Sequence, residues 1–200
     1  MFVHIHVDNG LIMGESDDMV EEFLTHLSKS YSIKTKKKHT QQSGYILSWK
    51  PNGSIIIHQQ DFSTKILDEF KMMSSRSIKT PDRASIHNFV SRTLTTFHKY
   101  KMQKAIGMLS YLALHTEPDI IFTTNLLSQF VNQPTMAHWS LVKHLLQYLK
   151  GTRGLGLHYT KSQNQDGELM GWADSHYATS LVTKKSQSGY LIMFFGNPIA

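Results

Sequence analysis

Residues 6–10, His-Val-Asp-Asn-Gly, place a single carboxylate, Asp8, between two short apolar segments. The simplest explanation is conformational, because Asp or Asn next to Gly favours a tight turn. The alternative is a metal ligand on a rigid hairpin, because Mg²⁺ is bound by hard oxygen ligands such as carboxylates. Such a site needs another carboxylate from elsewhere in the chain, since the neighbouring Asn9 is neutral and a poorer ligand. Both explanations stay open from these residues alone.

His4 and His6 lie two positions apart, so on a strand both imidazoles share one face and could reach a common metal ion. Metal-dependent hydrolases use this spacing on a first strand, with further His and Asp ligands after later strands. The chain lacks a regular strand–helix series to carry those ligands. Histidines beside a core strand are more often packing residues, so a metal-dependent hydrolase that uses His4 and His6 is the less favoured alternative.

Asp174 is the second carboxylate of interest and lies in Gly-Trp-Ala-Asp-Ser-His-Tyr-Ala, residues 171–178. An acid within a strand-like run of apolar and aromatic residues costs desolvation energy unless it faces water at an edge or has a partner or a metal. An edge position and a ligand role are both open. The sequence contains no His-Glu-x-x-His, no phosphate-binding loop and no Gly-x-Ser-x-Gly, so the enzyme classes that use those motifs are not indicated.

Positive charge is clustered along the chain, whose formal net charge is +6. The interval between Glu22 and Asp61 has no acidic residue, and residues 71–104 contain eight Lys or Arg against one acid, Asp82. Clustered positive charge favours a polyanion, because each neutralised phosphate releases counterions. A solvated Lys-rich surface is the alternative. The lysines expected to contact nucleic acid are Lys34, Lys36, Lys37, Lys38, Lys99, Lys101 and Lys104.

The composition excludes several classes of protein. The 200 residues are 40% hydrophobic, enough for a globular core, and contain no cysteine, which rules out disulfides, thiolate nucleophiles and Cys-ligated metals. No run approaches the roughly 18 apolar residues that a membrane span needs. The N-terminus lacks the basic and apolar regions of a signal peptide. We therefore expect an intracellular protein without a membrane-spanning segment.

The pattern of apolar residues predicts the elements that position these side chains. Residues 2–14 alternate as a β-hairpin with a type I′ turn at Asn9-Gly10. Residues 17–31 have one apolar helical face, and Ser16 precedes them as an N-cap. A second hairpin is predicted around a Pro-Asn-Gly turn at residues 51–53.

The middle of the chain is predicted to be helical and its end to be stranded. Residues 73–99 are polar and basic with little periodicity, so we expect a linker there. The last of the helices should end at Gly151, because glycine favours helix ends. The helical segments expected from apolar spacing are residues 62–70, 101–115, 118–131 and 135–150. The strands expected after them are residues 155–159, 169–178 and 188–195, with a turn at residues 163–168.

Taken together, these segments resemble copia-type LTR retrotransposon polyproteins. The first hairpin resembles the Tyr-Val-Asp-Asp hairpin of reverse transcriptases. Residues 106–157 resemble the segment between polymerase and ribonuclease H, which carries the patterns Ile-Gly-x-Leu-x-Tyr-Leu, Thr-Arg-Pro-Asp-Ile, His-Trp and Tyr-Leu-Lys-Gly-Thr. Residues 171–178 and 184–200 resemble the start of the ribonuclease H domain. The resemblance covers nearly the whole chain, in the order and spacing of the family.

The resemblance implies roles for individual residues. Asp8 corresponds to the first Asp of the polymerase hairpin, a ligand of the catalytic Mg²⁺, while Asn9 stands in place of the second Asp. His6 stands in place of the Tyr near the primer end. Asp174 corresponds to the first metal-binding Asp of ribonuclease H. Glu117 replaces the Arg of Thr-Arg-Pro-Asp-Ile, which is a charge reversal. Mg²⁺ is thus the cofactor of the intact family enzyme, and Asp8 and Asp174 are its residual ligands.

The resemblance also implies an α+β fold in three parts. Residues 1–72 are expected to hold the palm hairpin and thumb-like helices, and residues 73–151 a linker and helical connection. Residues 152–200 are expected to hold the opening antiparallel strands of an incomplete ribonuclease H fold, with residues 172–177 paired to residues 189–195. The expected partners are an RNA–DNA hybrid or a DNA or RNA duplex, and the remainder of the polyprotein.

The activity of the family is RNA-directed DNA synthesis with removal of RNA from the hybrid. In the family, the fingers and another palm Asp precede the hairpin, and further ribonuclease H carboxylates follow the matched segment. Two-metal phosphoryl transfer needs several carboxylates to hold ions about 3.5–4 Å apart. We therefore expect a fragment that lacks most catalytic carboxylates, binds no Mg²⁺ tightly and is inactive alone. A non-catalytic nucleic-acid-binding remnant is the alternative.

Overall fold

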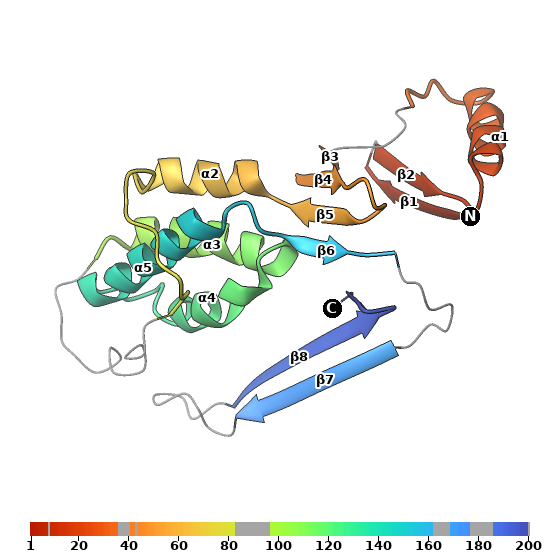
Figure 1. Ribbon diagram of the computed structural model, residues 1–200. Helices are drawn as coiled ribbons and strands as arrows, with labels where there is room; N and C mark the ends of the chain where they lie inside the picture. Colours follow the sequence, from red (N-terminus) through yellow and green to blue (C-terminus); the bar gives the residue numbers. More distant parts are fainter. Residues whose placement is uncertain are drawn as a thin grey trace. The chain divides into compact units, whose positions relative to one another are not determined.

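The computed structural model describes residues 1–7, 9–35, 41, 42, 44–82, 97–161, 169–176 and 186–199. The chain forms two compact units, Met1–Leu47 and Ser48–Ala200, and combines helices with small antiparallel sheets (Figure 1). Among the described residues, none of the helices has the length and apolar character needed to cross a membrane. The three-part division expected from the family resemblance stays a prediction.

The first unit begins with a hairpin and a helix. Its elements are β1 (Phe2–His6), β2 (Asn9–Met13), α1 (Asp17–Ser28), β3 (Gln41–Gln42) and the first part of β4 (Tyr45–Trp49). The predicted cap of α1 is confirmed, because the Ser16 hydroxyl accepts a hydrogen bond from the backbone N–H of Met19 at 3.3 Å. Asp17 and Asp18 occupy the first turn, where negative charge complements the helix dipole. β3 and β4 pair antiparallel.

The turn of the first hairpin is not where the sequence predicts it. His6 pairs with Asn9, so the chain reverses between these residues, and both Asn9 and Gly10 belong to β2. The predicted type I′ turn at Asn9-Gly10 is therefore wrong. The observed register pairs all five residues of each strand. With a turn at Asn9-Gly10, only the residues of β2 after Gly10 could pair with β1 before Ser16 caps α1. The observed ladder is longer, and its additional backbone hydrogen bonds outweigh the local preference of Asn-Gly for a turn.

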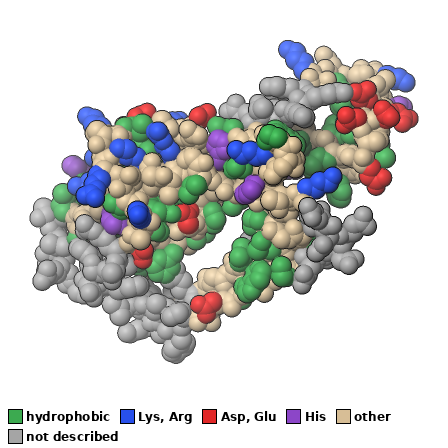
Figure 2. All heavy atoms as spheres, in the orientation of Figure 1, with side chains coloured by type: hydrophobic (Ala, Val, Ile, Leu, Met, Phe, Trp, Pro, Cys, Tyr) green, Lys and Arg blue, Asp and Glu red, His purple; other side chains and the backbone are tan. Residues whose placement is uncertain are grey.

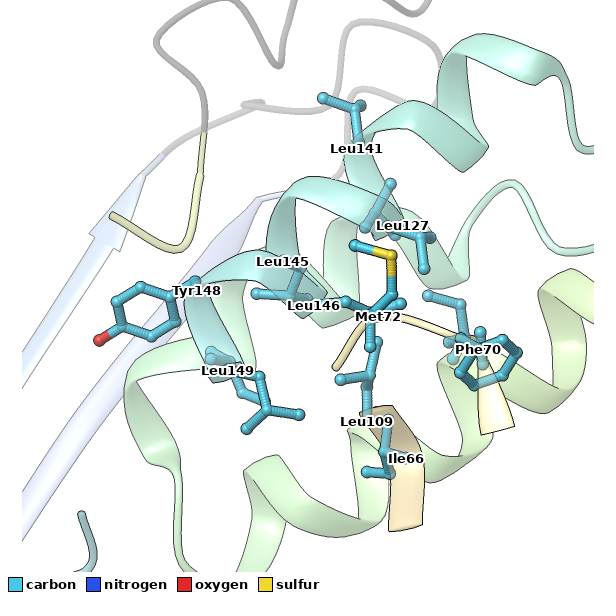
Figure 3. Packing of buried hydrophobic residues seen from close by; sticks show 14 of the residues in the cluster. Ile66, Phe70, Met72, Leu109, Leu127, Leu141, Leu145, Leu146, Tyr148 and Leu149 are labelled. Atoms are coloured by element: carbon cyan, nitrogen blue, oxygen red, sulfur yellow. The ribbon is translucent and has the colours of Figure 1, made fainter. Parts of the chain in front are cut away.

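The second unit is built around helices that share one hydrophobic core. The helices are α2 (Gln60–Glu69), α3 (Lys99–His115), the 3₁₀ turn η2 (Pro118–Ile120), α4 (Ile121–Ser128) and α5 (Met136–Thr152). The α-helices contribute fully buried apolar side chains such as Ile66, Leu109, Leu127 and Leu145 (Figure 3). The 3₁₀ turn contributes Ile120, which is also fully buried. The predicted helix at residues 118–131 is thus a 3₁₀ turn followed by a shorter α-helix.

Gly151 does not end α5, which contradicts the prediction. The helix continues through Gly151 to Thr152 and is followed by Arg153 as its C-cap. A Cβ at Gly151 would lie 3.3 Å from Cβ of Ser77 and 3.4 Å from the backbone oxygen of Ile78. The glycine therefore permits the segment before α3 to approach α5 closely.

Residues 73–82, within the predicted linker, are held against α5. Ile78 packs on the core, and its backbone N–H donates to the Gln147 carbonyl at 3.4 Å. The Lys150 ammonium group donates a hydrogen bond to the Ser75 carbonyl. This part of the expected linker is consequently ordered by contacts with a helix far along the chain, while residues 83–96 lie outside the described part.

The strands of the second unit form two antiparallel groups. In one group β5 (Ile55–His58) lies between the end of β4 and β6 (Leu157–Tyr159). The other contains β7 (Leu169–His176), β8 (Gln187–Phe194) and β9 (Asn197–Pro198), in that order. Asn197 links the groups, because its side chain accepts from the Thr160 N–H at 2.7 Å and donates to the Thr160 carbonyl at 3.0 Å. β9 is thereby anchored just beyond β6.

Candidate metal and nucleic-acid sites

The first hairpin is strained where the chain reverses between β1 and β2. Val7 has a φ of +56°, which is rare for a β-branched residue, and its side chain is 87% exposed. Backbone strain of this kind concentrates at functional sites. Asp8 and the side chain of His6 lie outside the described residues. The structure thus identifies a strained position directly before Asp8.

The His-x-His pair gains no support as a metal site. His4 is exposed on β1 and pairs with Leu11 of β2. Across the described residues, no group of three or more His, Asp or Glu side chains is arranged to hold a metal ion. A hydrolase site built on His4 and His6 therefore has no described third ligand.

Asp174 lies on an exposed strand whose predicted pairing is confirmed. β7 pairs antiparallel with β8, with Asp174 opposite Gly189 and Trp172 opposite Leu191. Asp174 and Trp172 share a face of the strand, and both are exposed. A Cβ at Gly189 would meet no heavy atom within 4 Å, so the position opposite Asp174 is open.

The described residues do not make a complete Mg²⁺ site. Over the described part of the chain, Asp174 belongs to no group of three or more His, Asp or Glu side chains that could hold a metal ion. At the hairpin, the residue after Asp8 is Asn9, whose amide is neutral.

The lysines expected to bind nucleic acid differ in their exposure and in their contacts within the molecule. Lys34 and Lys99 are exposed, while Lys36, Lys37 and Lys38 lie outside the described residues. Lys104 forms an ion pair with Glu69 at 2.7 Å, and this hydrogen bond raises the pKa of Lys104. The Lys101 ammonium lies 4.7 Å from the ring centroid of Trp139, a cation–π contact. Two lysines of α3 thus already have partners within the molecule.

The surface charge around these lysines is mixed. Figure 2 shows Lys and Arg side chains spread over the helices of the second unit, with Asp and Glu side chains among them on the same face. A field of a single sign would attract a polyanion more strongly than this arrangement does. The clusters along the sequence do not by themselves create a continuous basic surface on this face.

A buried carboxyl group, that of Glu117, lies beside the exposed Asp119 and was not predicted from the sequence. Glu117 is 3% exposed and hydrogen-bonds to Asp119, whose other partner is the Tyr148 hydroxyl, the donor to Oδ2 of Asp119. Burial raises the pKa of Glu117 to about 8, and the charge of Asp119 and the hydrogen bond to it act in the same direction. Burial also raises the pKa of Tyr148. The charge reversal at Glu117 was the one sequence signal that pointed here.

Further buried polar side chains lie next to Glu117 and at the start of α2. The Thr116 hydroxyl donates to the side-chain oxygen of Gln59 at 3.0 Å, and both residues are 2% exposed. The side-chain nitrogen of Gln59 has no hydrogen-bond partner among the described residues. This contact joins the end of α3 to the start of α2.

Comparisons with known proteins place this geometry in context. The chain is 29% identical over 203 residues to the retrovirus-related Pol polyprotein from transposon TNT 1-94 of Nicotiana tabacum, a match that covers 98% of the chain. It is 27% identical over 202 residues to the corresponding polyprotein from transposon RE1 of Arabidopsis thaliana, which covers 100% of the chain. The homologues of this chain include transposon Pol polyproteins.

The chain spans only 15% of the tobacco Pol polyprotein and 13% of the RE1 Pol polyprotein. A shorter relative is an uncharacterised mitochondrial protein of Arabidopsis thaliana, 28% identical over 190 residues, of which the chain covers 77%. No protein-family model and no solved structure matches the chain. The likeness to Pol polyproteins therefore extends along nearly the whole chain, but it concerns only a small part of each polyprotein.

Proposed function

We propose that this chain is a segment of a copia-type retrotransposon Pol polyprotein that spans the end of the reverse transcriptase palm, thumb-like helices and the first strands of ribonuclease H. The observation that carries the proposal is the alignment of 98% of the chain with the tobacco Pol polyprotein. The strained Val7 beside Asp8 and the pairing of Asp174 with Gly189 agree with the two expected carboxylate positions. The parent function is RNA-directed DNA synthesis with RNA removal.

The exposed apolar strands support the remainder of the polyprotein as the partner. No described residue of the first unit is buried, and the exposed fractions of Phe2 and Ile5 are 76% and 72%. In the second unit, Leu169 and Tyr190 on β7 and β8 are 66% and 72% exposed. Large apolar side chains left exposed on strands favour contact with another protein segment. Further polyprotein segments would cover these strands in the parent element.

The 200 residues alone should be catalytically inactive. In-line phosphoryl transfer by two metal ions needs several carboxylates, and Asn9 lacks the negative charge of the Asp that the family carries there. Replacing a carboxylate by an amide weakens Mg²⁺ binding. The hairpin shape survives this replacement, because Asn9 remains paired with His6 in β2.

A primer-extension assay tests this proposal. The purified chain should extend no primer, and Asn9→Asp alone should not restore extension. A chimera that places the fingers and palm of a related Pol polyprotein before residue 1 should extend weakly with Asn9 and much faster with Asn9→Asp. Asp8→Asn in the faster chimera is the control and should abolish extension. Extension by the unmodified chain, or equal activity of the chimeras with and without Asn9→Asp, would overturn the assignment.

A non-catalytic role in binding duplexes is the second candidate, favoured by the exposed Lys34 and Lys99. These lysines would meet phosphates, which carry no sequence information, so binding should be independent of sequence. The logarithm of the affinity should fall linearly with the logarithm of salt concentration, and Lys99→Ala should reduce the slope by about 0.9. Lys104→Ala is the matched control, because Lys104 is already paired with Glu69. A flat salt dependence, or binding to one sequence only, would exclude this role.

A further inference from the structure

The outer side of α3 carries a row of exposed residues, although the opposite side of this helix is packed in the core. Tyr100 is 78% exposed, Leu114 is 70% exposed and Tyr111 is 38% exposed. Gln103 and Gly107 are exposed between them. Residues that are three, four or seven positions apart share one side of a helix, so these residues form a single stripe. We call this stripe the α3 face.

Gly107, at the centre of the α3 face, has no packing role within one copy of the chain. A Cβ at this position would meet no heavy atom within 4 Å in the part of the chain that the structure describes. Glycine in a helix interior is less favourable than alanine, so its presence here has no reason inside one molecule. The distance between two packed helices depends on the side chains at their contact. Gly107 therefore suits a position where a second helix crosses α3 closely.

The α3 face is symmetric about Gly107. Tyr100 and Leu114 lie seven positions before and after it, and Gln103 and Tyr111 lie four positions before and after it. When two α3 helices run antiparallel and cross at Gly107, Tyr100 of each copy lies level with Leu114 of the other copy. Gln103 of each copy then lies level with Tyr111 of the other. A two-fold dimer uses the same patch on both copies, so it needs a patch that is complementary to itself in this way.

Charge favours the antiparallel arrangement over a parallel one. Lys99 is exposed in the first turn of α3, and this turn contains no acidic residue. A cation at this end opposes the helix dipole. In an antiparallel pair, the first turn of one α3 lies beside the last turn of the other, where the carbonyl groups form the negative end of the dipole. A parallel pair would instead bring the two Lys99 side chains together.

We propose that the α3 face is a homodimer interface, in which two copies of the chain pack antiparallel about a two-fold axis at Gly107. A contact through one helix of each copy is smaller than the about 800 Å² per partner of a standard stable interface. The dimer is therefore weak, with a dissociation constant in the micromolar range. It goes beyond the proposed polyprotein function and does not depend on it.

Sedimentation velocity of the whole chain over a range of concentrations tests the dimer. The unmodified chain should convert from monomer to dimer as its concentration rises through the micromolar range. Leu114→Lys should weaken association at least about tenfold, because it places an ammonium group in each apolar contact. Leu155→Lys is the matched control, since Leu155 is 58% exposed but lies outside α3, and association should be unchanged. A chain that stays monomeric at every concentration, or a dimer that Leu114→Lys does not weaken, would overturn the proposal.

Cross-linking tests the geometry, and it is specific because the chain contains no cysteine. Gly107→Cys should form a disulfide between copies on mild oxidation, since the Cβ atoms of a disulfide lie only about 3.5–4.5 Å apart. A short thiol cross-linker should join Tyr100→Cys to Leu114→Cys in a mixture. It should not join Tyr100→Cys to itself, because these positions lie about 21 Å apart along an antiparallel pair. Lys143→Cys, exposed on α5, is the control and should not cross-link. Cross-linking of Tyr100→Cys alone, or no Gly107→Cys disulfide at concentrations where the chain dimerises, would contradict the antiparallel pair.

Discussion

At the scale of single residues, two glycines differ in the space around their Cα atoms. Gly156 precedes β6, and a Cβ there would lie 2.3 Å from the Ile57 backbone oxygen and 2.7 Å from Cβ of His58. Gly107 lies within α3, and a Cβ there would meet nothing within 4 Å. Gly156 is needed for close approach of the strands, whereas within one copy of the chain Gly107 only adds backbone entropy to the unfolded state.

Gly156→Ala and Gly107→Ala should therefore change stability in opposite directions. Gly156→Ala forces the backbone of β5 and the chain before β6 apart and should lower the free energy of unfolding by about 1–3 kcal/mol. Gly107→Ala should raise it by about 0.5–1 kcal/mol, because alanine is the better helix former. Urea denaturation with a shared slope measures both. A stabilising Gly156→Ala would show that the strands do not approach as described.

Site residues are predictable from the sequence only where a motif marks them. Asp8 and Asp174 stand out because each lies between apolar segments, and the family resemblance also predicts that the strand of Asp174 pairs with the strand that contains Gly189. The burial of Glu117 is not predictable in this way, because it results from packing between elements, and the hydrogen bond from Tyr148 to Asp119 likewise joins residues 29 positions apart. Sequence spacing carries no information on such long-range contacts.

At the scale of elements, the start of α5 depends on a capping box that titrates. The Thr135 hydroxyl accepts from the His138 N–H at 3.4 Å, and Nδ1 of His138 accepts from the Thr135 N–H at 3.1 Å. Nδ1 can accept only while the imidazole is neutral. Burial lowers the pKa of His138, which agrees with this role. The cap is therefore a pH-sensitive contact on the acid side.

His138→Gln should remove an acid-dependent loss of stability. Because the pKa of His138 is lowered in the folded state, stability is complete above the ordinary value of 6.5 and falls as the pH drops below it. Glutamine at this position retains the capping geometry and does not titrate. Thr135→Ala should instead cost about 1 kcal/mol at every pH. Thermal midpoints between pH 7 and pH 5 distinguish the variants, and an acid loss that persists in His138→Gln would refute the assignment.

Elements are predictable where their signals are local. Ser16 and the apolar faces of the helices predict the starts and types of α1, α3 and α5 within about two residues, because caps and periodicity act within a few positions. The predicted turn at Asn9-Gly10 and the predicted stop at Gly151 are wrong. The first depends on the register of a whole ladder, and the second on Ser77 and Ile78, which contact the helix from another part of the chain.

At the scale of the whole molecule, the two units differ in how much they bury. The second unit has a continuous core, whereas α1 contains no buried residue. Opening free energies follow buried apolar contact, so backbone amides of α1 should exchange at least about a hundredfold faster than those of α5. Hydrogen exchange at several protein concentrations measures this difference. Equal protection that disappears on dilution would show that a second copy covers the first unit, and equal protection at all dilutions would contradict the described burial.

The stack of Trp139 on Phe97, beside α3, makes Trp139 an internal fluorescence probe. Trp139 is 6% exposed and stacks on Phe97 at 4.6 Å, whereas Trp49 and Trp172 are 45% and 51% exposed. Iodide should therefore quench emission from the two outer indoles and spare the inner one, whose emission lies at shorter wavelength. Spectra recorded with and without iodide separate events in the helical core from events at β4 and β7, without any label on the protein.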